Sequence, residues 1–276
     1  METRQKRHRR SSVSARLFIA IYLLCVLVPL AVIFVWAFTG LWPWPDLVPQ
    51  EFSNRGITEI FVSQKDLGFV LAQSVLIAIM VAILSTVIAA LAARALVHHS
   101  FVGREAFRFL TVLPFLIPTT VFAMGVQVAF IRAGLAYTVP GVIMAHCIVA
   151  LPYATIIMTD ITKAAGNRLE QQARCSGAGH LRTLTHVQIP LLLPGLMSAL
   201  SMSYIISFSQ YFLTLLVGGG TVKTFAVVMF PYLASSDRTI ASAYGVVFLV
   251  VTLAVFAVFE LLIRRYTRSR VEYYTG

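Results

Sequence analysis

Six long runs of apolar residues follow one another along this 276-residue chain, and no other feature constrains its fold as strongly. A bilayer core about 30 Å thick is crossed by about 20 residues of α-helix, and each run reaches that length. The predicted spans are Leu17–Phe38, Val70–Ala93, Phe109–Ile131, Val139–Met158, Leu191–Val217 and Ile240–Ile263. The sequence therefore predicts an all-α polytopic membrane protein with six transmembrane helices.

The composition excludes the main water-soluble classes. Hydrophobic residues make up 58% of the chain and charged residues only 12%, against about 25% charged residues in an average soluble domain. A soluble protein of this size has too little interior to bury so much apolar side chain, so lipid must cover it. This excludes a soluble enzyme, a disulfide-stapled secreted domain and a disordered scaffold. The first run exceeds the roughly 7–15 residues of a signal-peptide core, and we expect it to be a retained anchor.

Lysine and arginine gather on one side of the predicted membrane. Of the 22 Lys and Arg, six fall in 1–16, three in 94–108, four in 163–182 and four in 264–270, which are alternate segments. The other five lie in the intervening segments, where five acidic residues balance them. Because basic loops stay in the cytoplasm, both termini are expected to be cytoplasmic. The net charge of +11 thus reflects topology, and no nucleic-acid partner is expected.

Sequence patterns for catalysis and metal binding are missing. The segment 218–224 lacks the spacing of a Walker A motif, and neither HExxH nor a metal-spaced Cys/His cluster occurs. Only His146 lies near the middle of a span, whereas a proton-coupled carrier would need buried acids or a relay. The chain is therefore expected to be neither an enzyme nor a metal protein.

Polar side chains in the fifth span are candidates for lining a translocation path. At 100° per residue, four of them share a stripe about 60° wide on a continuous helix. The stripe contains Ser203, Ser207, Gln210 and Thr214, with Tyr211 beside it. Such a face avoids lipid by meeting either another helix or a wet cavity, and both readings stay open. We expect His146 to be a packed, hydrogen-bonded core residue, with a solute contact as the alternative.

The cytoplasmic segment 160–190 is too polar to enter the membrane. It is helical in character through Ala173, and Ser176-Gly177-Ala178-Gly179 then separates two amphipathic pieces. A short helix–turn–helix on the membrane surface, with glycine where backbones approach closely, suits docking to a cytoplasmic partner.

This segment resembles the cytoplasmic motif of the permease subunits of binding-protein-dependent ABC importers. That motif reads EAA, three residues, G, nine residues, I, any residue, LP. Here Gln171-Gln172-Ala173, Gly177 and Val187-Gln188-Ile189-Pro190 reproduce every spacing, and the final Ala, the Gly and the Pro are identical. Gln171 stands in place of the leading Glu, although Glu170 is adjacent. The resemblance extends from about Phe69 to Ile263 and covers five spans.

The resemblance implies a type I, MetI-like importer permease in the inner or plasma membrane of a bacterium. Such a subunit pairs with a second permease, here expected to be a different chain, and receives its solute from an external binding protein. Two cytoplasmic ATPase subunits would hydrolyse ATP, and this chain itself would bind no cofactor. The residues assigned by position to the ATPase-coupling loop are Glu170, Gln171, Ala173, Gly177, Ala178 and Pro190.

The solute is not fixed by the sequence. The polar stripe suits a small polar molecule, and the general resemblance leans towards the polyamine, thiamine or ferric-iron group. The alternative function is a stand-alone secondary transporter or channel. The expected organisation is a basic cytoplasmic N-terminus (1–16), a first transmembrane helix (17–38), an external loop (39–68), a permease domain (69–263) and a basic cytoplasmic tail (264–276).

Overall fold

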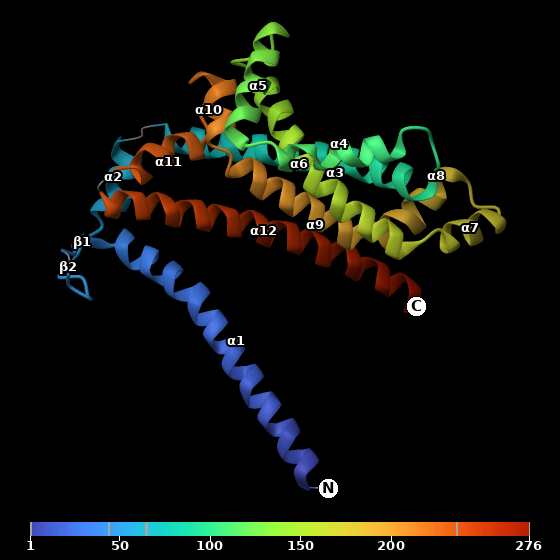
Figure 1. The fold of residues 1–276 in the computed structure, drawn as a ribbon, viewed down its shortest axis with the longest axis horizontal. Coiled ribbons are helices and arrows are strands. Elements are labelled where there is room, and N and C mark those ends of the chain that lie inside the picture. The colour runs from blue at the N-terminus through green and yellow to red at the C-terminus, as the bar shows by residue number, and fades with distance from the viewer. Residues whose placement is uncertain (1, 44, 64–65, 236, 276) are drawn as a thin grey trace. The chain divides into compact units, whose positions relative to one another are not determined.

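The computed structural model describes the backbone of residues 2–43, 45–63, 66–235 and 237–275. Side chains are described within these ranges except at 2–14, 63, 115 and 262–275, so the basic ends of the chain lie outside the described side chains. The fold is helical throughout apart from one short strand pair (Figure 1). It divides into two compact units, Met1–Lys65 with Pro231–Val251, and Asp66–Phe230 with Thr252–Gly276.

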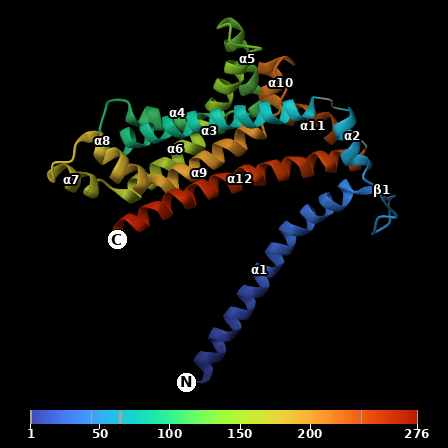
Figure 2. The same ribbon diagram turned by 180° about the vertical axis from the view of Figure 1, so that it is seen from behind.

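Three long helices form the centre of the larger unit. They are α3 (Leu67–His98), α6 (Val139–Ala165) and α9 (Ile189–Phe208), and they lie side by side in both views (Figures 1 and 2). Where they meet, small residues on all three are fully buried, namely Ala89, Ala93, Ala154 and Ala199. Small side chains let the backbones approach closely, which is how helices associate in lipid.

Shorter helices surround this centre. They are α4 (Arg104–Leu116), α5 (Thr119–Arg132), α7 (Arg168–Cys175), α8 (His180–Thr183), the π-helical segment η1 (Leu184–Gln188), α10 (Phe212–Gly218) and α11 (Phe225–Leu233). The helix α10 packs against α5 and α6, and buried Val142, Leu213 and Val217 belong to that apolar cluster. The second part of α12 (Arg238–Thr275) brings Phe256 and Phe259 edge-on to Tyr204.

The predicted third span, Phe109–Ile131, is not one helix. The chain bends by 108° between α4 and α5. Pro118 disfavours helical geometry at the residue before it, and Ile117 is accordingly extended, with ψ of 131°. The helix therefore ends at Leu116 and a new one begins at Thr119.

The predicted fifth span, Leu191–Val217, is also wrong as a single helix. The helix α9 ends at Phe208, and α10 begins at Phe212. The Ser209 amide still donates to the Ile205 carbonyl at 3.0 Å, but the Gln210 amide donates to the Ser207 carbonyl, three positions back, at 3.2 Å, so the α-helical bonding ends there. At its other end α9 continues η1 and α8 without a break, so this helical run begins at His180 rather than at Leu191.

Within the described residues, five helical segments are long and apolar enough to cross a membrane, or six if the bent pair α4–α5 is one span. The five are Ala15–Ala37, Leu67–His98, Val139–Ala165, His180–Phe208 and Arg238–Leu261. They overlap the predicted first, second, fourth, fifth and sixth spans. The prediction of an all-α polytopic membrane protein is confirmed.

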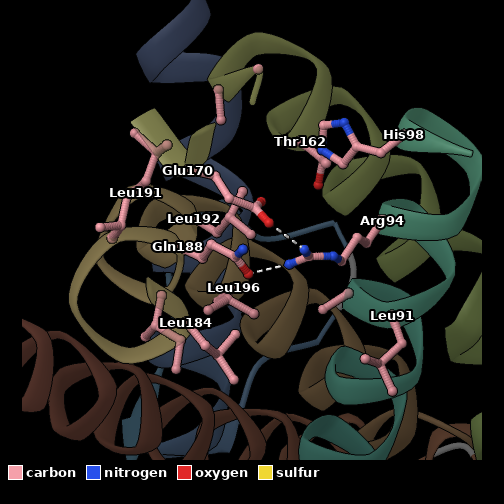
Figure 3. Close-up of a pocket in the computed structure, with 15 residues that line it drawn as sticks. Leu91, Arg94, His98, Thr162, Glu170, Leu184, Gln188, Leu191, Leu192 and Leu196 are labelled. Carbon is pink, nitrogen blue, oxygen red and sulfur yellow. Dashed lines mark hydrogen bonds and ion pairs between the residues drawn. The ribbon is translucent and has the colours of Figure 1, made fainter. Parts of the chain in front are cut away.

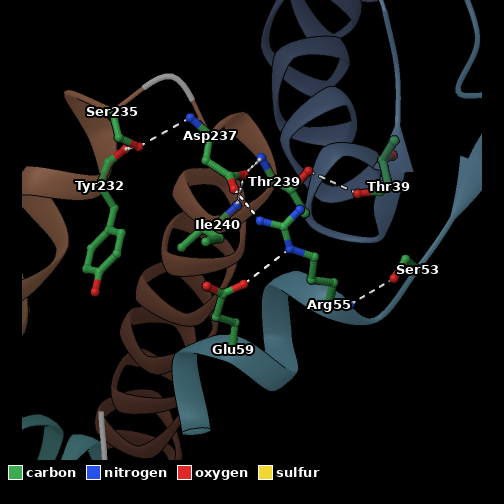
Figure 4. Close-up of polar contacts among 9 residues, drawn as sticks. All are labelled: Thr39, Ser53, Arg55, Glu59, Tyr232, Ser235, Asp237, Thr239 and Ile240. Atoms are coloured by element: carbon green, nitrogen blue, oxygen red, sulfur yellow. Dashed lines mark hydrogen bonds and ion pairs between the residues drawn. The ribbon is translucent and has the colours of Figure 1, made fainter. Parts of the chain in front are cut away.

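The smaller unit carries most of the predicted external loop, 39–68. It contains α1 (Glu2–Ala37), the antiparallel pair β1 (Thr39–Leu41) and β2 (Glu51–Phe52), α2 (Arg55–Ser63) and the first part of α12. Figure 4 shows how Asp237 caps α12, accepting from the Thr239 and Ile240 amides at 3.1 and 3.2 Å. The other Asp237 oxygen lies 2.8 Å from Arg55, which also pairs with Glu59. A hydrogen bond to Glu59, with the negative charge of Asp237, raises the pKa of Arg55 above its ordinary value.

Candidate functional site

The helix α7, eight residues long, lies between two glycines with positive φ, Gly166 (63°) and Gly177 (81°). Glu170 lies in its first turn and Arg174 in its last, the placement that the helix dipole favours. The predicted helix–turn–helix in 160–190 is therefore present, with α7 and α8 as its two helices.

Gly177 ends α7 in a Schellman motif. Its own amide donates to the Arg174 carbonyl at 3.0 Å, and the Ala178 amide donates to the Ala173 carbonyl at 3.0 Å. The motif needs a left-handed residue at this position, which glycine adopts without steric cost. A Cβ built at Gly177 meets no atom within 4 Å, so the chain itself leaves room for a side chain there.

The loop presents an open surface. None of the residues of α7 is buried, and Gln171 and Gln172 are exposed. Leu181, at the start of α8, is 78% exposed although it is apolar. Ala173, Ala178 and Pro190 are half-buried. Two of the predicted coupling residues, Gln171 and Gly177, thus lie on an accessible surface, which has room for a protein partner.

Glu170 differs from its neighbours because it faces inward. Its carboxylate is 2.7 Å from Arg94 of α3 and 2.7 Å from Arg174 of α7, and its side chain is 14% exposed (Figure 3). The Arg94 guanidinium also donates to the Gln188 side chain at the end of η1. Arg174 in turn contacts the His180 ring at 3.2 Å. A polar chain therefore runs from the base of α9, through α3 and α7, to the start of α8.

A cavity of about 150 Å³ adjoins this polar chain. Apolar residues, among them leucines of α3, η1 and α9, form most of its wall, and Arg94, Glu170 and Gln188 lie on its polar side (Figure 3). Apolar walls lower the local dielectric and strengthen the attraction between Arg94 and Glu170.

A second polar cluster surrounds His146, which is fully buried in α6. Its Nδ1 lies 2.8 Å from the Ser207 hydroxyl of α9, and its Nε2 lies 2.8 Å from the Thr214 hydroxyl of α10. The Thr214 hydroxyl donates to the Gln210 carbonyl at 2.8 Å, so it accepts from His146. We assign the proton of the neutral ring to Nε2 on this basis, with Ser207 donating to Nδ1. The prediction of a packed, hydrogen-bonded His146 is confirmed.

The predicted polar stripe is only partly preserved, because the helix break interrupts it. Ser203, Ser207 and Thr214 are buried, and Ser203 Oγ has no hydrogen-bond partner among the described residues. Gln210 lies within the break and is half-buried. Tyr211 stacks on Phe230 with ring centroids 3.7 Å apart. The single continuous face predicted for Ser203 to Thr214 is therefore wrong, although Ser207 and Thr214 do meet at His146.

Two residues of the site, Arg94 and Gln188, were not predicted. In the sequence Arg94 is one of the three basic residues of segment 94–108, and Gln188 stands at the variable position of the motif. A partial signal for Arg94 exists, since it directly follows the apolar run Val70–Ala93 on a helix that continues to His98; Arg132 and Arg264 follow apolar runs in the same way, so this signal alone does not single it out. In the described part of the chain, no group of three or more His, Cys, Asp or Glu side chains is arranged to hold a metal ion.

The sequence is similar to inner-membrane proteins of transport systems. The model of the binding-protein-dependent transport system inner membrane component matches residues 82–268. The spermidine/putrescine permease protein PotC of Haemophilus influenzae is 24% identical over 192 residues, 70% of this chain and 75% of that protein. The osmoprotective compounds uptake permease protein GgtD of Synechocystis is 26% identical over 193 residues, covering 69% and 64%.

A solved structure shares the fold. A chain of a bacterial ABC transporter that imports the acidic polysaccharide alginate superposes with a TM-score of 0.69. The match covers 91% of this chain and 96% of that one, at 18% sequence identity.

Proposed function

Since the chain belongs to the family of inner-membrane components of binding-protein-dependent transport systems, we propose that it forms one half of a solute path whose other half is a different permease chain. The chain is a permease subunit of an ABC importer, and its relatives give no support to a stand-alone secondary transporter or channel. Two ATPase subunits on the cytoplasmic side would hydrolyse ATP, and an external binding protein would deliver the solute. This chain itself would bind no cofactor.

The loop 160–190 is the proposed contact with the ATPase. The observation that carries this proposal is the exposure of α7, whose residues occupy the motif spacing and include no buried side chain. Gln171 and Gly177 lie on this accessible surface, so a partner can reach them. Energy from ATP would then enter the permease through α7 and α8.

The proposed orientation has both termini and the loop in the cytoplasm, in the inner or plasma membrane of a bacterium. It rests on the 17 Lys and Arg of the alternate segments against five in the others. The same side would then hold both the basic residues and the ATPase contact.

The proposed solute is a small polar molecule. The name of a relative, the spermidine/putrescine permease PotC, favours a polyamine among the expected classes. Thiamine and ferric iron stay predictions without such support. The candidate residues of the path, Ser203, Ser207, Gln210, Tyr211, Thr214 and His146, carry uncharged polar groups, which is the basis for proposing a small polar solute. In the described structure Ser203, Ser207, Thr214 and His146 are buried, so a solute would reach them only after the helices separate.

Two substitutions at one position test the coupling contact. In Gly177→Asp a charge is added to the proposed interface, and an unpaired charge there costs several kcal/mol. In Gly177→Asn the new side chain has nearly the same shape as aspartate and tolerates the left-handed backbone, but it adds no charge. We expect Gly177→Asp to lose co-purification of the ATPase and at least about tenfold of solute-stimulated ATP hydrolysis, and Gly177→Asn to retain most of both. Wild-type behaviour of Gly177→Asp would refute the coupling role of the loop.

Gln171→Ala provides a graded comparison. This change removes a neutral amide, and a single hydrogen bond of that kind contributes about 1 kcal/mol. Its effect on ATPase docking should therefore be smaller than that of Gly177→Asp in the same co-purification assay.

A further inference from the structure

Arg94 joins three elements that the chain brings together from distant positions. It lies near the end of α3, and its guanidinium contacts Glu170 of α7 at 2.7 Å and the Gln188 side chain at the end of η1. Among the described residues, Arg94 is the residue of α3 that hydrogen-bonds to α7. The loop and two central helices therefore share one side chain.

The remaining attachment of α7 is slight. This helix buries none of its residues, and it packs against α8 and η1, which belong to the same loop and its base. The glycines at its two ends, Gly166 and Gly177, have positive φ and open surroundings. The Arg94–Glu170 ion pair is accordingly the polar link between α7 and the helices beneath it.

The Glu170 side chain points from α7 towards α3 rather than towards the open surface of the loop. In this chain the residue at the first motif position is a neutral, exposed glutamine, and the acidic side chain one residue earlier turns away from the surface. Glu170 thus binds α3 and leaves the outer surface of α7 uncharged at Gln171. Its carboxylate contacts two guanidinium groups, one from α3 and one from its own helix.

We propose that Arg94 is a positioning residue for energy coupling, holding α7 to α3 and to the base of α9 so that a displacement of the loop moves both helices together. The proposal rests on the coupling function proposed above. Arginine suits the task because its planar fork reaches Glu170 and Gln188 from one group, whereas a lysine ammonium is a single point charge.

The test uses the assembled transporter with its ATPase, second permease and binding protein in proteoliposomes. The measured quantity is the number of solute molecules taken up per ATP hydrolysed. Arg94→Ala removes the link, and Arg94→Lys retains the charge without the fork. Arg108→Ala is the matched control, because it deletes another arginine of the basic segment 94–108. Within the described part of the chain, the ion pair of Arg108 is an exposed contact with Glu105, three positions earlier on the same helix.

We expect Arg94→Ala to retain co-purification of the ATPase, since Gln171 and Gly177 are unchanged, and to lower uptake per ATP about tenfold. Arg94→Lys should fall between Arg94→Ala and the wild type, and Arg108→Ala should match the wild type. A double variant of Arg94→Ala with Glu170→Ala should lower uptake per ATP by less than the product of the two single effects, because both changes remove the same Arg94–Glu170 pair.

Two outcomes would overturn the proposal. The first is unchanged uptake per ATP in Arg94→Ala. The second is a parallel fall in assembly, ATP hydrolysis and uptake with their ratio unchanged, which would make Arg94 a folding residue only. Failure of the coupling-loop assignment is recognised separately, by normal ATPase docking in Gly177→Asp.

Discussion

At the scale of single residues, His146 connects the two sides of a helix break. Its Nδ1 accepts a hydrogen bond from the Ser207 hydroxyl of α9, and its Nε2–H donates one to the Thr214 hydroxyl of α10. Between those two residues the chain leaves helical geometry for three positions. Both nitrogens of a buried ring are thereby satisfied, and the polar groups that the break introduces into an apolar region find partners inside the protein.

Thr214 provides the sharpest test of this network. Thr214→Val has nearly the same shape but no hydroxyl, so His146 Nε2–H is left buried without an acceptor, at a cost of about 1–3 kcal/mol. Thr214→Ser retains the hydroxyl and loses only a methyl group, worth about 0.8 kcal/mol. In thermal unfolding of the purified complex, Thr214→Val should therefore melt at a lower temperature than Thr214→Ser. Equal melting temperatures would mean that the ring does not depend on Thr214.

At the scale of helices, the contact between α6 and α9 depends on one glycine. A Cβ built at Gly195 would lie 2.8 Å from Ile161 Cγ2 and 2.9 Å from Ile161 Cβ. Real carbon atoms do not approach so closely, so α9 reaches α6 only because position 195 has no side chain. On α9, Gly195 lies between the end of the loop 160–190 and Ser207, which belongs to the His146 cluster.

Gly195→Ala should separate these helices. Overpacking of a tight contact costs about 1–3 kcal/mol, more than the gain in helix propensity of about 1 kcal/mol. Gly125→Ala in α5 is the control, because a Cβ there meets nothing within 4 Å and only the propensity gain applies. Thermal unfolding should show a loss for Gly195→Ala and no loss for Gly125→Ala. A Gly195→Ala variant as stable as the control would contradict the close contact.

The helices also show where prediction from sequence succeeds and where it stops. Hydropathy located α3, α6 and α12 because length and apolar character are local properties. It missed the breaks at Pro118 and at Ser209, since the residues around both are apolar enough to continue a span. Proline alone is no guide, because Pro152 and Pro194 lie inside unbroken helices. What distinguishes the breaks is backbone geometry: Ile117 is extended before Pro118, and the Gln210 amide bonds to a carbonyl three positions back. A hydropathy profile does not contain this information.

At the scale of the whole molecule, the basic residues and the exposed loop fall on one predicted side. The motif spacing allowed the loop residues to be predicted, and the Schellman turn at Gly177 follows from local rules. The pairing of Arg94 with Glu170 did not follow from them, because 76 positions separate the two residues and only the packing of α3 beneath α7 brings them together. Local features of the site were therefore predictable, whereas its tertiary link was not.

The proposed orientation can be tested with a native cysteine. Cys175 is exposed at the end of α7, whereas Cys147 is buried. In a Cys25→Ser background, a membrane-impermeant maleimide should label Cys175 in inverted vesicles and not in intact spheroplasts. Val48→Cys, at a position 69% exposed in the predicted external loop, should show the opposite pattern when combined with Cys25→Ser and Cys175→Ser. Labelling of Cys175 from outside would reverse the topology.

The π-helical segment η1 has a consequence for how such chains vary in length. A π turn arises when one extra residue is accommodated within an α-helix while the helices on either side keep their phase. Residues Leu184–Gln188 lie between the Gly177 turn and Pro190, so this stretch contains one residue more than regular α geometry needs. Removal of one residue from η1 would restore regular α geometry and leave the loop and the membrane helix facing the same ways, but it would shorten the nine-residue spacing between Gly177 and Val187. An insertion or deletion inside α7, by contrast, would rotate Glu170 by about 100° away from Arg94, and selection should oppose it.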